Sequence, residues 1–97
     1  MTTYEISAAR LLDSAGQEFL VISIPPEHYG DPEIRNRYFE LLGVLEMPLV
    51  LVSATSESEW SIRAIGPHLL KEMASVKVET LGWHRMPVIC EAVPWEV

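Results

Sequence analysis

Short runs of apolar residues alternate with polar, turn-forming segments, and the order of these runs predicts the elements of the fold. Two runs, Phe19–Ile24 and Leu49–Val52, are apolar at nearly every position, which is typical of strands buried on both faces. Pro25-Pro26 ends the first run, because proline cannot donate to a sheet ladder. A helix is predicted between the runs, with Asp31 as N-cap and Pro32 at its first position. This order predicts a βαβ crossover with parallel pairing.

The N-terminal segment has two interpretations. Thr3–Ala8 alternates polar and apolar residues like a half-buried strand. However, Ile6–Ala15 contains good helix formers and is followed by Gly16, a suitable helix C-cap. The turn-forming residues Asp13–Gly16 favour a hairpin that leads into a strand over Gln17–Ile24. We therefore expect a strand in the first segment, with a helix over residues 6–15 as the alternative.

The second half of the chain predicts further short elements. Trp60–Ile65 alternates cleanly and is expected to form a strand with one solvated face. Gly66-Pro67 then opens a second, short helix. Val76–Thr80 alternates again and predicts another strand, and a last edge strand over residues 87–93 is left open.

Residues 17–81 are thus expected to run βαββαβ, the element order of a ferredoxin-like two-layer α+β sandwich. An extra strand is added at the N-terminus, and one at the C-terminus is left open. Because crossovers of this kind are right-handed, both helices should stack on the same face of the sheet. Residues 1–97 are expected to form a single small globular domain, since a chain of 97 residues buries one modest core.

The charge balance narrows the classes of partner. Acidic residues number 14 against 7 basic ones, which gives a net charge of −7. Nucleic acid is not expected as a partner, because its binding rests mainly on Lys and Arg at phosphates. A membrane is not expected either, since no apolar stretch approaches the roughly 18 residues of a span. The first residues lack the basic segment of a signal peptide, and Cys90 is the single cysteine, so we expect the reducing cytoplasm.

No catalytic, metal-binding or phosphate-binding motif stands out. The sequence therefore predicts no cofactor and no metal, and it does not favour an enzyme. Histidines and aromatic residues near element ends are the best candidates for binding a ligand, because helix starts attract anions and aromatic turn clusters can stack on a ligand. The predicted ligand-binding residues are His28, Tyr29, His68, Trp83 and His84.

A second set of residues is predicted to contact a protein partner. Gly43 lies inside the long predicted helix, where glycine costs roughly 1 kcal/mol relative to alanine, so close approach of a partner to that face is expected. Phe39 and Arg35 precede Gly43 at intervals of about one turn. Acidic and aromatic residues of the following polar segment complete the surface. The predicted interface comprises Arg35, Phe39, Gly43, Glu57, Glu59 and Trp60.

The best-supported prediction is a small acidic module that regulates or binds another protein, or associates with itself. A sharper version is an immunity- or inhibitor-type protein whose acids neutralise a basic toxin or nuclease. The alternative is a small dimeric enzyme or ligand-binding protein, with His, Tyr and Trp residues in a pocket between sheet and helices. Convergence of at least two of the residues His28, Tyr29, His68 and Trp83 on one concave site would favour the enzyme.

Overall fold

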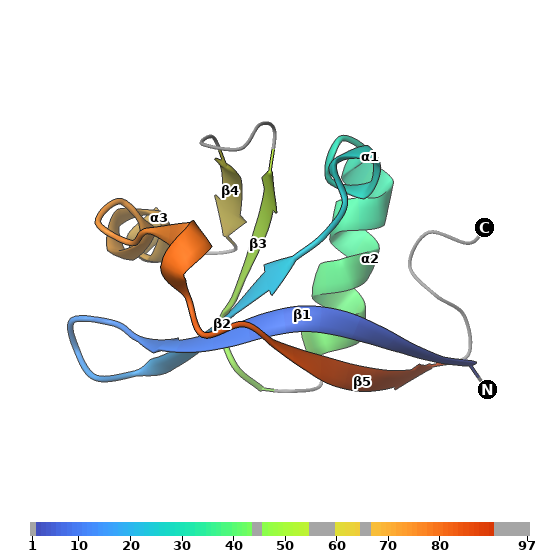
Figure 1. Ribbon diagram of the computed structural model, residues 1–97, viewed down its shortest axis with the longest axis horizontal. Helices are drawn as coiled ribbons and strands as arrows, with labels where there is room; N and C mark the ends of the chain where they lie inside the picture. The colour runs from blue at the N-terminus through green and yellow to red at the C-terminus, as the bar shows by residue number, and fades with distance from the viewer. Residues whose placement is uncertain (1, 44–45, 55–59, 65–66, 91–97) are drawn as a thin grey trace.

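The computed structural model describes residues 2–43, 46–54, 60–64 and 67–90. Its strands are β1 (Thr2–Leu12), β2 (Glu18–Ser23), β3 (Leu49–Ala54), β4 (Trp60–Ala64) and β5 (His84–Cys90). Its helices are α1 (Pro26–Tyr29), α2 (Pro32–Leu42) and α3 (Pro67–Met73), with a 3-10 turn, η2 (Val78–Thr80). The strands form one sheet in the order β4-β3-β2-β1-β5 (Figure 1).

The predicted βαβ crossover is confirmed. Strands β2 and β3 pair in parallel, and α1 and α2 lie on the connection between them. Asp31 caps α2 as predicted, since its carboxylate accepts a hydrogen bond of 2.9 Å from the Glu33 amide. The other strand pairs of the sheet are antiparallel, so the sheet is mixed.

The predicted N-terminal hairpin is also confirmed, and the helical alternative over residues 6–15 is wrong. Strands β1 and β2 pair from Ser7↔Ser23 to Leu12↔Glu18. The Asp13 carboxylate accepts hydrogen bonds from the amides of Ala15 and Gln17, at 2.9 and 2.8 Å. Gly16 adopts φ +82° in this turn, a conformation that residues with a Cβ rarely take. Local turn chemistry therefore decides this segment.

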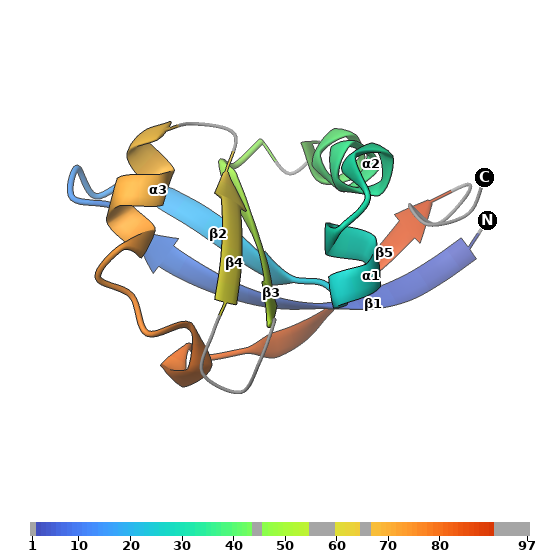
Figure 2. The ribbon, with the colours of Figure 1, turned by 90° about the horizontal axis from the view of Figure 1, so that it is seen from above.

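Helices cover both faces of the sheet. Successive side chains of a strand point to opposite faces, and β2 and β3 bury both sets. On one face, the core contains Tyr38 and Leu42 of α2 with the strand residues Tyr4, Ile6, Ala8, Leu20, Ile22, Leu49 and Leu51. On the other, it contains Leu69 and Met73 of α3 with Phe19, Val21, Val50, Val52 and Val78. Figure 2 shows α2 and α3 on either side of strands β2–β4.

The predicted ferredoxin-like βαββαβ sandwich is therefore wrong, although the α+β class remains appropriate. The last strand, β5, pairs with β1 at the sheet edge opposite to β4. The connection from β4 to β5 must therefore cross the whole sheet, and α3 crosses it on the face that α2 leaves open. A second helix on the α2 face would have left Phe19, Val21 and Val50 in contact with water.

The strand predicted over Val76–Thr80 is wrong as well. This segment contains η2. Thr80 closes its turn by donating two hydrogen bonds to the Lys77 carbonyl, one from its amide at 2.9 Å and one from its hydroxyl at 2.7 Å. Val76 and Val78 nevertheless pack against the α3-side core, while Lys77 is exposed. The alternation of apolar and polar residues thus reflects which side chains are buried, although this segment is not part of the described sheet. The edge strand left open over residues 87–93 exists as β5, and residues 91–93 lie outside the described part.

Candidate functional site

A cavity of about 540 Å³ opens where β2 leaves the sheet. Pro25 follows Ile24, whose amide still bonds to the Val52 carbonyl of β3 at 3.0 Å. The chain then turns into α1. Because β2 and β3 are parallel, their carboxyl ends, Ser23 and Ala54, meet at the same edge and both line the cavity. This is the usual position of ligand sites in sheets with parallel strands.

The cavity combines apolar and polar walls. Its apolar lining consists of Ile6, Ile24, Pro25, Pro26 and Ala54, and its polar lining of Glu5, Ser7, Ser23, His28 and Tyr38. Both the volume and this mixture are typical of small-ligand sites, where apolar walls supply contact and a few polar groups fix orientation. The residues come from β1, β2, β3, α1 and α2, so the fold as a whole creates the site.

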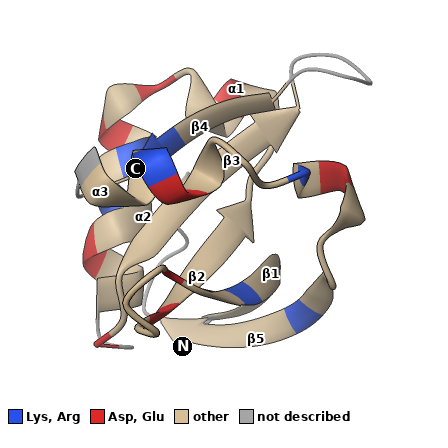
Figure 3. Cartoon of the chain, turned by 90° about the vertical axis from the view of Figure 1, so that its left-hand side faces the viewer, with Lys and Arg blue, Asp and Glu red and all other residues tan. Residues whose placement is uncertain are grey.

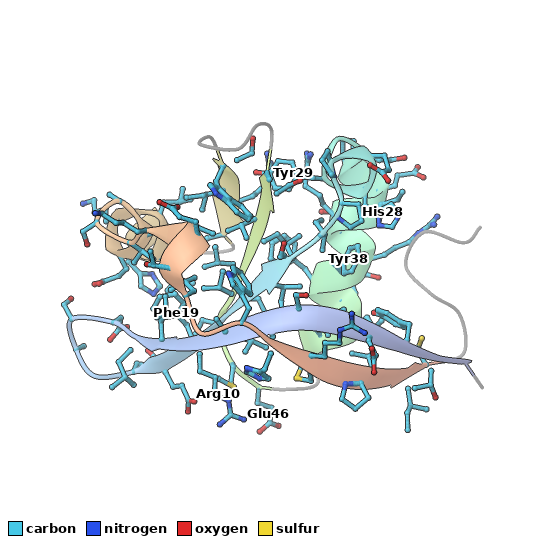
Figure 4. The ribbon with its side chains drawn as sticks, in the orientation of Figure 1. Arg10, Phe19, His28, Tyr29, Tyr38 and Glu46 are labelled. Atoms are coloured by element: carbon cyan, nitrogen blue, oxygen red, sulfur yellow. The ribbon has the colours of Figure 1, made fainter. Side chains whose placement is uncertain are left out.

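His28 and Tyr38 meet at the wall of the cavity (Figure 4). His28 Nδ1 lies 3.1 Å from the Tyr38 hydroxyl, and the two rings are tilted by 36°. Burial raises the pKa of Tyr38 to about 12, so this phenol keeps its proton at neutral pH. His28 and Tyr38 thus form one hydrogen-bonded polar pair within a half-apolar wall.

The raised pKa of Tyr38 predicts a loss of stability at alkaline pH. Unfolded tyrosine ionises near its model value of 10.0, whereas folded Tyr38 ionises near 12. The contribution of Tyr38 to the free energy of unfolding is therefore fully present below pH 10.0. It decreases between pH 10.0 and about 12, because only the unfolded state loses the phenol proton in this range. Between about pH 9 and 11.5 the Tyr38 contribution to the free energy of unfolding should decrease by about 2 kcal/mol, and Tyr4, whose pKa burial also raises, adds to the total decrease. Urea denaturation at about pH 9 and 11.5 measures it. The Tyr38→Phe variant should show a smaller decrease, and an equal decrease would contradict this assignment.

A second hollow of about 310 Å³ adjoins the cavity on the same stretch of β1. It is lined by Glu5, Ile6, Ser7 and Arg85, and the first three of these also line the cavity. Arg85 Nη1 bonds to Glu5 Oε2 at 3.0 Å across β1 and β5, and both side chains are exposed. The two hollows thus flank the same residues of β1, and a charged pair stands at their rim.

Of the predicted ligand-binding residues, His28 lines the cavity, whereas Tyr29, the next residue of α1, is not among the lining residues. The Arg35 guanidinium sits 5.4 Å from the centre of the Tyr29 ring and donates a hydrogen bond to the Tyr29 carbonyl. Burial raises the pKa of Tyr29, and the charges of Arg35 and Arg63 act against this rise. Arg35, which was predicted at an interface, therefore also braces α1 against α2.

The remaining predicted ligand-binding residues lie elsewhere. Trp83 stacks on Trp60 with ring centres 6.5 Å apart, and its Nε1 donates to the Val78 carbonyl at 3.1 Å. Both tryptophans pack against the α3-side core. His68 is exposed on α3, and His84 is exposed at the start of β5. Of the four residues His28, Tyr29, His68 and Trp83, the cavity lining therefore contains only His28.

The predicted protein interface stays a prediction, but Gly43, from which it was argued, lies at a different place in the helix than expected. Gly43 ends α2 as its C-cap instead of lying inside the helix, and a Cβ added there would meet no described atom within 4 Å. Nothing among the described residues therefore approaches it closely. Phe39 is half-buried and packs against the α2-side core. Glu57 and Glu59 lie outside the described residues.

Sequence reasoning missed most of the cavity. Glu5, Ser7 and Ser23 are ordinary polar positions within strands, and Tyr38 was not among the predicted ligand-binding residues. The one usable signal was the pair Pro25-Pro26, which forces β2 to end while β1 continues. That difference in strand length opens the space.

The rest of the described surface adds little specific chemistry. Acidic and basic positions are interleaved along helices and strands (Figure 3). Within the described ranges, no three His, Cys, Asp or Glu side chains are placed to hold a metal ion. None of the helices described combines the length and apolar character needed to cross a membrane. Comparison with known proteins finds no matching family model, curated protein or solved structure.

Proposed function

We propose that this protein is a binding module that takes up a ligand in the cavity at the carboxyl ends of β2 and β3. The observation that carries the proposal is the convergence of five polar residues and five apolar ones on one space of about 540 Å³. A ligand with both an apolar part and hydrogen-bonding groups suits such walls. Binding would regulate the protein or bring it to a partner, as expected for a small interaction module.

The polar residues supply complementary hydrogen-bonding groups. Ser7 and Ser23 each provide a hydroxyl that can donate and accept, and the Glu5 carboxylate only accepts. All three belong to neighbouring positions of the sheet, since Ser7 pairs with Ser23 and Glu5 lies two residues before Ser7 on the same face. A ligand held here would therefore be oriented by rigid strands.

The other functions suggested by the sequence receive less support. The enzyme alternative depended on at least two of His28, Tyr29, His68 and Trp83 meeting in one concave site, and only His28 lines the cavity. The immunity-type alternative rests on the acidic residues of the chain in general, and of these only Glu5 is among the described residues that line the cavity. A binding module that uses the cavity therefore has the strongest geometric support.

Ligand screening by NMR tests the proposal. Mixtures of small polar metabolites are titrated into the ¹⁵N-labelled protein, and a true ligand should shift the amides of Ser7, Ser23 and His28 together. The His28→Ala variant should weaken binding by roughly tenfold, equivalent to about 1.4 kcal/mol. His84→Ala is the matched control, because His84 is exposed and does not line the cavity. Equal losses in both variants, or shifts confined to other surfaces, would contradict the proposal.

A further inference from the structure

Strand β1 is longer than the strand beside it, and this difference exposes part of its edge. Its pairing with β5 extends from Thr2 to Ala8, whereas its pairing with β2 begins only at Ser7. On the β2 side, Glu5 and Ile6 border the cavity instead of a described strand. The hydrogen-bonded pair Asp13–Gln17 shows that odd-numbered residues of β1 direct their backbone N–H and C=O toward β2, so it is Glu5 that presents these groups to the cavity. An extended backbone with one side open is a template for another strand.

The departure of β2 fixes the size and shape of this space. Continued pairing would place Ile24 opposite Ile6 and the next residue opposite Glu5, as the register of Ser7↔Ser23 requires. That next residue is Pro25, which has no N–H and begins the turn into α1. The cavity thus occupies the line along which β2 would have continued.

We propose that the ligand of this cavity is an extended, basic polypeptide segment that adds a strand beside Glu5 and Ile6 of β1. This inference rests on the proposed function and names its ligand class. Main-chain hydrogen bonds to the open edge supply affinity in this mode of recognition, and neighbouring side-chain pockets supply specificity. The cavity walls formed by Ile24, Pro25 and His28 are such a pocket.

The preference for a basic segment follows from charge. The chain has a net charge of −7, which attracts cationic partners and speeds their association. Glu5 is exposed at the rim of the cavity, where its carboxylate already bonds to Arg85 at 3.0 Å. A lysine or arginine of the incoming strand would bind the Glu5 carboxylate together with Arg85 or in place of Arg85. An acidic segment would meet repulsion from the overall charge, while Glu5 and Arg85 would act on it in opposite directions.

The experiment uses capped peptides of about seven residues that alternate lysine with threonine, titrated into the full ¹⁵N-labelled chain. We expect saturable shifts of the Glu5, Ile6 and Ser7 amides, weaker at high salt. Replacing lysine by glutamate should weaken binding at least about tenfold. N-methylation of alternate peptide residues removes the backbone N–H donors along one edge of the peptide. This change should also weaken binding at least about tenfold.

A pair of charge reversals on the protein isolates the role of Glu5. Glu5→Lys and Glu18→Lys each change the net charge from −7 to −5, a difference of two. Each also breaks one exposed ion pair with an arginine, at 3.0 and 3.4 Å respectively. Only Glu5 lines the cavity, so Glu5→Lys should weaken binding of the lysine peptide roughly threefold to tenfold, and Glu18→Lys less than about twofold.

Each outcome decides between occupants. Equal effects of the two reversals, or undiminished binding of the N-methylated peptide, would overturn strand addition. Concentration-dependent shifts of Glu5 and Ile6 together with a dimer in native mass spectrometry would identify a second copy of the chain as the occupant and overturn the basic segment. If metabolites bind the cavity and the peptides do not, this inference fails while the proposed function stands. If peptides bind at residues 5–7 and no metabolite binds, both stand.

Discussion

Replacing Tyr38 by alanine is expected to destabilise the protein by about 3–5 kcal/mol, the usual cost of removing a large buried aromatic side chain. Tyr38 is only 2 % exposed and packs in the α2-side core with residues of β1, β2 and β3. Small domains are stable by only about 5–15 kcal/mol, so the variant should be partly or wholly unfolded at 37 °C. Urea denaturation followed by circular dichroism measures the loss.

The Tyr38→Phe variant separates packing from hydrogen bonding at the same position. Phenylalanine fills nearly the same volume but cannot bond to His28, whose Nδ1 lies 3.1 Å from the hydroxyl. We expect a loss of about 0.5–1.5 kcal/mol, typical of one hydrogen bond. A loss for Tyr38→Ala as small as that for Tyr38→Phe would show that the ring is not part of the core.

Much of the fold could be predicted because local chemistry determines it. Asp13 and Gly16 specify the hairpin turn, and Asp31 specifies the start of α2. The runs at β2 and β3 required full burial, and the structure buries both. These signals act over a few residues and do not depend on the rest of the chain, so the sequence alone was sufficient for them.

The expected arrangement of the helices on one face was wrong, because the central strands bury side chains on both faces of the sheet. Phe19 and Leu20 are adjacent and both nearly fully buried, and adjacent strand residues face opposite sides of a sheet. Strands apolar on both faces require cover on both faces. A two-layer sandwich covers only one face of the sheet with helices, and this does not suit central strands that are apolar on both faces.

The cavity could not have been predicted, because no local pattern describes it. Glu5 and His28 lie far apart in the sequence, and they meet at one cavity only because β1 continues after β2 has ended. The relative lengths of paired strands depend on register, which the sequence pattern leaves undetermined when residues alternate over a long stretch. Pro25 marks the end of β2 but does not indicate which strand extends past it.

The placement of α3 on the face opposite to α2 leads to the second large expected effect. Phe19 is 1 % exposed and belongs to the α3-side core together with Met73. Phe19→Ala should cost about 3–5 kcal/mol, and the cavity left behind should loosen the packing of Met73. In a double-mutant cycle, we therefore expect Phe19→Ala and Met73→Ala to be non-additive by about 0.5–3 kcal/mol.

Leu42 of α2 provides the matched control for this cycle, because it is also 1 % exposed but belongs to the α2-side core. Strand β2 separates it from Phe19, so Phe19→Ala and Leu42→Ala should add within about 0.5 kcal/mol. Chemical denaturation of the single and double variants gives both coupling energies. Similar coupling of Phe19 to Leu42 and to Met73 would place the two helices on the same face, as the ferredoxin-like arrangement requires. Coupling to Met73 with additivity toward Leu42 would follow from a sheet covered on both sides, since side chains couple through direct packing and the sheet lies between the two cores.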